Sequence, residues 1–119
     1  MEHDISPGAL LFVPLQRSGP DPHLAMALNE PDAEGNVQVI GCSTKTYTPE
    51  KLEELPSDPD RPKGHPRTKL RKRTFAVGDW IEDVSVSTVC RVKGFVPASV
   101  YDRVWDKILQ FRPDLTKPA

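Results

Sequence analysis

The stretch that decides the fold is residues 70–111, LRKRTFAVGDWIEDVSVSTVCRVKGFVPASVYDRVWDKILQF. Two runs rich in β-branched and aromatic residues, 74–80 and 89–94, predict strands, and the segment after Pro97 predicts an amphipathic helix. A single long helix after strands must pack on a small sheet, because no helical bundle is available to it. The C-terminal third therefore predicts a mainly β protein of the α+β class.

The apolar residues of the helical segment recur at steps of three and four. They are Val100, Tyr101, Val104, Trp105, Ile108 and Leu109, with Phe111 beside them. Such a stripe is typical of a helix that packs on a core, and a dimer face is the alternative. Ser99 followed by Asp102 resembles a capping box, and Pro113 is expected to end the helix.

The rest of the chain adds three strands and one short helix. Together, five strands are expected, at residues 9–15, 23–28, 37–40, 74–80 and 89–94. Thr48 as N-cap and Pro49 at the first helical position predict a short helix that Pro56 stops near Leu55. Glu82 and Asp83 are expected in the turn between the last two strands. A proline-rich loop (56–66) and a tail (112–119) complete a chain whose 119 residues fit one domain.

Charge is distributed unevenly along the sequence although the net charge is only −1. Residues 61–73 contain seven Lys or Arg and no acid, whereas residues 30–60 contain eight acids against Lys45 and Lys51. A local charge of +7 thus follows one of −6. A basic block of this kind favours phosphate-rich partners through counterion release. The alternatives are that the acidic segment neutralises it, or that both are solvated loops.

Several classes of protein are excluded by what the sequence lacks. No apolar run approaches the roughly 18 residues of a membrane span, and the N-terminus has no basic start of a secretory signal, so we expect a cytoplasmic protein without membrane contact. Cys42 and Cys90 lie in or next to strand candidates, which suits buried, reduced thiols. The three His residues have no zinc spacing, and no Gly-rich phosphate loop is present, so we expect no metal and no cofactor.

The order of these elements resembles the MazF/PemK-like toxins of type II toxin–antitoxin systems, which are small SH3-like β barrels. The resemblance rests on residues 8–13 (GALLFV), 39–44 (VIGCST), 68–72 (TKLRK), 74–77 (TFAV) with Asp79-Trp80, 91–96 (RVKGFV) and 101–109. It covers most of the chain. It implies an SH3-like barrel, a homodimer, metal-independent cleavage of single-stranded RNA and inhibition by an antitoxin protein.

The resemblance also implies site residues. The family's Ser-Thr pair after the third strand is matched by Ser43 and Thr44, and the carboxylate of some members by Asp79. The family's Arg-Pro at the second strand is not matched, because Pro22-His23 stands there, and Val77 replaces a second Arg. His23 is then the candidate base, because an imidazole suits proton transfer near neutral pH.

Cations for RNA are available in five candidate residues. They are Arg17, Lys69, Arg71, Lys72 and Arg73. With His23, Ser43, Thr44 and Asp79 they form the predicted site, in a groove under the 56–66 loop. Each has a structural alternative: His23 beside a proline can be structural, Ser43 and Thr44 can bond the backbone, and Asp79 can cap a turn.

Two functions of different classes follow. One is a toxin-like endoribonuclease acting on single-stranded RNA. The other is a non-catalytic member of the same fold that binds nucleic acid or a protein partner through the basic block. The missing Arg favours the second function, and the Ser-Thr pair with Asp79 favours the first.

Overall fold

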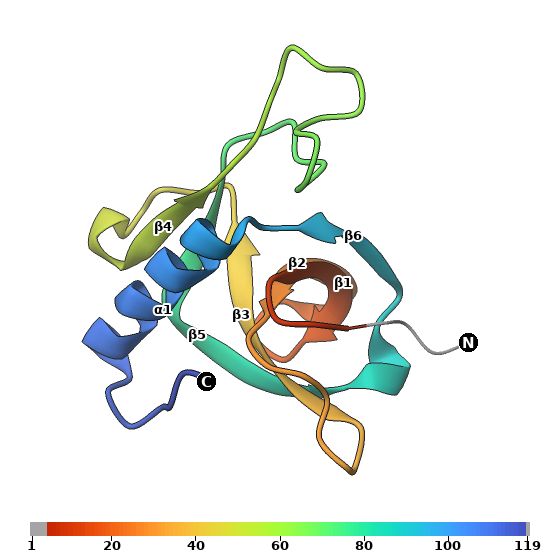
Figure 1. The fold of residues 1–119 in the computed structure, drawn as a ribbon, viewed down its shortest axis with the longest axis vertical. Coiled ribbons are helices and arrows are strands. Elements are labelled where there is room, and N and C mark those ends of the chain that lie inside the picture. Colours follow the sequence, from red (N-terminus) through yellow and green to blue (C-terminus); the bar gives the residue numbers. More distant parts are fainter. Residues whose placement is uncertain (1–4, 119) are drawn as a thin grey trace.

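A computed structural model describes residues 5–118 as an antiparallel sheet with a helix packed against it (Figure 1). The strands are β1 (Ala9–Leu15), β2 (Gly19–Ala27), β3 (Asn36–Ser43), β4 (Leu52–Leu55), β5 (Thr74–Ser85) and β6 (Arg91–Phe95). The other elements are two 3-10 turns, η1 (Pro49–Lys51) and η2 (Val86–Thr88), and the helix α1 (Ala98–Phe111). The predicted mainly β fold with a C-terminal helix is confirmed.

The strand order is β4-β5-β3-β2-β1-β6, and neighbouring strands are antiparallel. The sheet curls so strongly that β1 and β2 wind round each other at one end (Figure 1). Within residues 5–118 the edge strands β4 and β6 are not hydrogen-bonded to one another, so the barrel stays partly open. Figure 1 also shows part of the connector of residues 56–73 (green) projecting beyond the sheet.

Each face of the sheet buries its own apolar cluster, because successive strand residues point to opposite faces. One cluster contains Leu11, Val13 and Trp80, and the other contains Leu10 and Met26 beneath the helix. The helix contributes four buried residues to the second cluster: Val100, Val104, Trp105 and Ile108. The prediction that the helical stripe is core is thus confirmed for these four, whereas Leu109 is 37% exposed.

The short helix predicted over residues 48–55 is wrong. Only η1 is helical, Thr48 makes no side-chain cap, and residues 52–55 form the edge strand β4. Its backbone pairs with β5 from Leu52 opposite Val77 to Leu55 opposite Thr74, and Leu55 is fully buried. Pairing and burial therefore override the local helix signal, which extends no further than one turn.

The turn predicted at Glu82 and Asp83 is also wrong. β5 runs without a break to Ser85, with Val39 opposite Glu82 and Gln38 opposite Asp83. Strand β2 begins at Gly19, four residues before the strand predicted over residues 23–28. Prolines are tolerated there because β2 pairs with β3 only from Ala25 onward, which leaves the other edge free of ladder bonds.

Two smaller expectations also fail. Cys42 is buried, but Cys90 is exposed and precedes β6; both thiols are free. Burial raises the pKa of the Cys42 thiol to about 12. The helix has no capping box, since Pro97 is its N-cap and no side chain caps it, while it ends at Phe111 shortly before Pro113 as expected. In residues 5–118 no helix is long and apolar enough to span a membrane.

Candidate functional site

A basic groove with a volume of about 750 Å³ opens between β1, β2, β6 and the connector of residues 56–73. Its apolar and hydroxyl lining consists of Phe12, Leu24, Thr44, Pro62, Leu70 and Thr74. Its cations are Lys63, Lys69, Arg71, Lys72, Arg91 and Lys93. These six cations face no lining carboxylate, so the groove is strongly positive although the protein is nearly neutral. We call it the basic groove below.

The connector at the side of the groove is held in shape by hydrogen bonds among its own residues. Thr68 is fully buried and its hydroxyl donates to the Pro56 carbonyl at 2.7 Å, while it accepts from the Leu70 N–H at 3.2 Å. His65 Nδ1 accepts from the backbone N–H of Arg67 and of Thr68, at 3.1 and 3.3 Å. The loop therefore presents its Lys and Arg side chains from a defined backbone.

The connector packs directly on β6 where that strand has no side chain. The Phe95 N–H donates to the Arg67 carbonyl at 2.9 Å. A Cβ at Gly94 would lie 2.5 Å from that same carbonyl oxygen, closer than real Cβ contacts come. Gly94 thus permits the close approach that places the basic connector beside the sheet.

The acidic segment neutralises only part of the basic block. Glu54 holds Arg73 in a two-point ion pair at 3.0 Å, and Asp58 pairs with Arg61 at 3.1 Å. Hydrogen bonding to Arg73 lowers the pKa of the Glu54 carboxyl. Neither Arg73 nor Arg61 lines the basic groove, so the cations that do so stay available.

A second, smaller depression of about 260 Å³ lies on the other side of the end of β3. Its lining is Arg17, Ser43, Lys45, Tyr47, Thr48, Leu52, Val77 and Trp80. Ser43 lines this depression and its neighbour Thr44 lines the basic groove, so the two hollows lie on either side of this dipeptide. We call the smaller one the Arg17 pocket.

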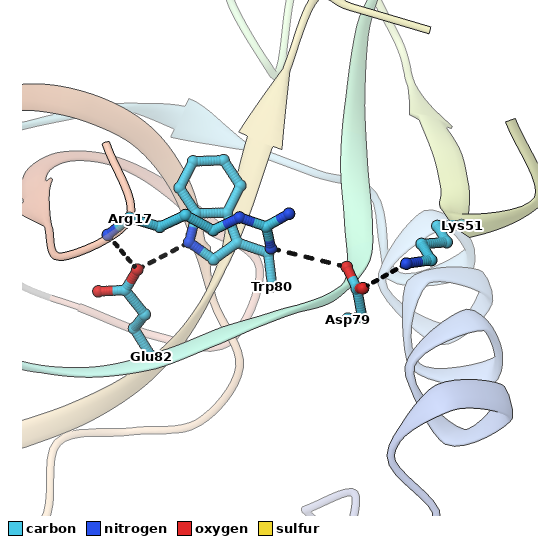
Figure 2. A network of polar contacts seen from close by, with 5 residues as sticks. All are labelled: Arg17, Lys51, Asp79, Trp80 and Glu82. Atoms are coloured by element: carbon cyan, nitrogen blue, oxygen red, sulfur yellow. Dashed lines mark hydrogen bonds and ion pairs between the residues drawn. The ribbon is translucent and has the colours of Figure 1, made fainter. Parts of the chain in front are cut away.

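Arg17 is held in this pocket from two directions (Figure 2). Its guanidinium lies over the Trp80 ring, 5.0 Å from the ring centroid, and 3.7 Å from Asp79 Oδ1. Glu82 fixes the loop beneath, because its carboxylate accepts from the backbone N–H of Gln16 at 2.7 Å and of Arg17 at 3.2 Å. Trp80 Nε1 donates to the same carboxylate at 2.7 Å.

The two carboxylates of this network are both held in their charged form. Burial alone would raise the pKa of Asp79, but the Lys51 ammonium at 2.7 Å and the Arg17 charge outweigh it and lower the pKa. Burial of Glu82 is likewise outweighed by hydrogen bonds from Trp80, Gln16 and Arg17, so its pKa is also lowered. Asp79 is therefore an electrostatic anchor for two cations and a weak proton acceptor.

His23 packs under Trp80 rather than standing free in the pocket. Their ring centroids are 5.1 Å apart, and His23 Nε2 lies 2.6 Å from the Cys42 carbonyl oxygen. A carbonyl only accepts, so Nε2 carries a proton, and Nδ1 is the ring nitrogen that this bond leaves free. Gly41 makes this packing possible, since a Cβ there would overlap the Trp80 indole.

The structure thus divides the predicted site residues between two hollows. Thr44, Lys69, Arg71 and Lys72 line the basic groove, and Arg17 and Ser43 line the Arg17 pocket, with Asp79 and His23 behind it. Arg73 belongs to neither, because Glu54 holds it. The sequence predicts residues 71–73 in one site with Asp79, but none of them lines the pocket in which Arg17 contacts that carboxylate. Within residues 5–118, no three His, Cys, Asp or Glu side chains group to hold a metal ion.

Sequence reasoning missed Phe12, Arg91 and Lys93 in the groove and Lys51 and Glu82 in the network. A signal existed for Arg91 and Lys93, because they alternate along a predicted strand and so share a face. No sequence signal pointed to Glu82 or Lys51, whose partners are up to 66 positions away.

The fold is that of solved MazF toxins. MazF from Deinococcus radiodurans superposes with a TM-score of 0.72 at 12% identity, covering 94% of this chain and 99% of that one. The Mycobacterium tuberculosis toxin MazF-mt6 superposes with a TM-score of 0.65 at 14% identity, covering 91% of this chain and 98% of that one. A mycobacterial endoribonuclease in complex with its cognate antitoxin superposes with a TM-score of 0.67 at 15% identity, covering 95% of this chain and 98% of that one. No family model and no curated protein matches the sequence. These likenesses confirm the expected MazF-like fold.

Proposed function

We propose that the protein binds single-stranded RNA in the basic groove and cleaves it without a metal at the Arg17 pocket, as a toxin-like endoribonuclease. The observation that carries the proposal is a groove with six cations and no lining carboxylate on a protein of net charge −1. Phosphates are the ligands that such a groove attracts, through counterion release. The fold that this chain shares with two mycobacterial endoribonuclease structures supports RNA as the polymer.

The chemistry would use the ribose 2′-OH as nucleophile. The bond from O2′ to phosphorus forms and the bond from phosphorus to O5′ breaks, while the 2′ proton leaves to a base and O5′ gains a proton. Arg17 would stabilise the negative charge of the phosphorane, and the Ser43 hydroxyl would donate to a phosphoryl oxygen. His23 Nδ1 is the nitrogen available to accept a proton, and Asp79 and Glu82 would hold Arg17 in position.

An antitoxin and a second copy of the chain belong to the same proposal. A mycobacterial endoribonuclease of the same fold is solved in complex with its cognate antitoxin. By analogy, an antitoxin protein would inhibit this chain, the active form would be a homodimer, and the protein would work in the cytoplasm, where free thiols such as Cys42 and Cys90 persist. Each statement is a proposal that rests on the fold.

A non-catalytic binding module is the second candidate, and a specific observation favours it. Arg17 is already engaged by Asp79 and by the Trp80 ring, and His23 by the Cys42 carbonyl. Groups held in this way keep the fold together without any reaction. Such a protein would use the basic groove and leave RNA intact.

Cleavage of a long single-stranded RNA in EDTA decides between the two. The wild type should release discrete fragments ending in a 2′,3′-cyclic phosphate, and DNA of the same sequence should stay intact because it lacks the 2′-OH. Arg17→Gln should slow cleavage about 100-fold, since the variant loses the charge that meets the phosphorane. His23→Asn should slow it too, by 10²-fold or more if its Nδ1 takes the proton.

The matched control is Arg103→Gln. Arg103 pairs with Glu53 at 3.6 Å and lines neither hollow, so this variant should cut RNA at the wild-type rate. RNA that stays intact but is bound with salt-sensitive affinity would establish the binding module instead. RNA that is neither cut nor bound would reject both functions.

A further inference from the structure

Three side chains form a row across the floor of the basic groove. Phe12 of β1 stands opposite Leu24 of β2 on one side and opposite Arg91 of β6 on the other. The Arg91 guanidinium lies over the Phe12 ring, 4.6 Å from the ring centroid, and the Lys93 ammonium is 5.8 Å from it. An aromatic ring with an aliphatic neighbour and two cations therefore lies at the base of a strongly positive hollow.

This floor continues a face of the sheet that the helix does not cover at this point. Leu10 and Met26 lie two residues along their strands from Phe12 and Leu24, on the same face, and belong to the cluster buried beneath α1. Phe12 and Leu24 are only half-buried. No residue of α1 lines the groove, and the connector closes only its side. Phe12 and Leu24 thus form accessible apolar surface inside a site whose other lining is mainly cationic.

Phosphate alone gives no reason for such a floor. An anion is held by the cations, and exposed aromatic and aliphatic surface adds nothing to that contact. A nucleobase, in contrast, has a flat apolar face that stacks on a ring and a polar edge that needs a hydrogen-bonding partner. Thr44 lines the same groove, and its hydroxyl makes no hydrogen bond within residues 5–118, so it can meet that edge.

We propose that Phe12, Leu24 and Arg91 form a subsite for one unstacked nucleobase of a single strand, with the flanking phosphates on Lys69, Arg71 and Lys93. The inference rests on the proposed function for the identity of the polymer. It goes further in making the groove a reader of bases as well as of charge. The base stacks on the part of the Phe12 ring that the Arg91 guanidinium leaves uncovered, and it contacts Leu24 beside that ring.

Binding of two uncleavable probes to Phe12→Leu tests the subsite. The first probe is a 2′-O-methyl RNA oligonucleotide and the second is the same backbone with its bases removed, each followed by fluorescence anisotropy. Phe12→Leu should weaken binding of the first about tenfold, the size of one lost base–aromatic stack, and leave binding of the second unchanged. Phe12→Tyr keeps the ring and should bind both within about twofold of wild type.

The controls separate this proposal from protein stability and from cleavage. Thermal midpoints near wild type would show that the half-buried position tolerates leucine. Equal weakening of both probes, or no weakening of either, would overturn the subsite, as would an acidic peptide of equal charge that binds as tightly as the first probe. Neither probe can be cut, so a base-dependent loss would stand even if long RNA stayed intact in EDTA and the proposed cleavage failed.

Discussion

Glu82 holds together the loop and the indole that form the Arg17 pocket. Its carboxylate accepts three hydrogen bonds, from two backbone N–H groups of the β1–β2 loop and from Trp80 Nε1. Without it, both the loop that carries Arg17 and the indole beneath Arg17 would lose a partner. The pocket is therefore built on a side chain that does not line it.

Glu82→Gln should lower stability in a pH-dependent way. The pKa of Glu82 is lowered in the folded protein, so its contribution is present above the unfolded value near 4.5 and is lost as pH falls through the folded value. We expect a loss of about 2 kcal/mol at pH 7, typical of hydrogen bonds to a charged group, that shrinks below pH 4.5. Urea unfolding at pH 7, 5 and 3.5 measures it.

The neighbouring Asp83 gives the matched control for that series. It is exposed and its carboxylate makes no hydrogen bond within residues 5–118, so Asp83→Asn should change the unfolding free energy little at pH 7. A Glu82→Gln deficit of the same size at all three pH values would contradict the charge-assisted bonds. The pairing of residues 16 and 17 with residue 82 is invisible in the sequence, because nothing local depends on it.

At the scale of elements, α1 shows why one prediction succeeded and β4 why another failed. The spacing of the apolar residues in α1 follows from the helix geometry itself, so the sequence alone predicts the helix without knowledge of what it packs against. Residues 52–55, LEEL, have no period of either kind, and their conformation is decided by β5, more than 18 residues further on. Likewise, Glu82 and Asp83 resemble a turn only until β3 is placed opposite them.

The two faces of α1 can be tested with adjacent residues. Ile108→Ala should lower the free energy of unfolding by about 2–5 kcal/mol, because Ile108 is fully buried and its removal leaves a cavity against the sheet. Leu109→Ala, at a side chain that is 37% exposed, should cost about 0.5 kcal/mol if the helix is free on that face. Denaturant unfolding compares them.

The Leu109 variant also bears on the alternative that this helix face lies in a dimer. If Leu109→Ala shifted the oligomeric state measured by sedimentation, the exposed part of the stripe would be an interface. A loss of stability at Leu109 as large as at Ile108 would contradict the burial of Ile108 in the core and the exposure of Leu109.

At the scale of the whole molecule, net charge and local charge point to different behaviour. A protein of net charge −1 has little long-range attraction for RNA, yet its fold gathers six cations around one groove and ties Arg61 and Arg73 to carboxylates elsewhere. The sequence predicted a basic block but not its partition, nor that Arg91 and Lys93 join it from β6. The curl of the sheet places β6 and the connector around one groove and so brings these cations together.

The salt dependence of RNA binding measures how many of these cations act together. For a single strand, log K falls with log of the salt concentration by about 0.7 per phosphate neutralised, so full use of six cations gives a slope of about −4. Lys69→Ala should make the slope shallower by about 0.7, whereas Arg103→Ala, at a cation paired with Glu53 outside the groove, should leave it unchanged. Anisotropy titrations of a 2′-O-methyl RNA oligonucleotide between 50 and 300 mM salt suffice. A wild-type slope near zero, or equal effects of the two variants, would show that the strand does not lie in the basic groove.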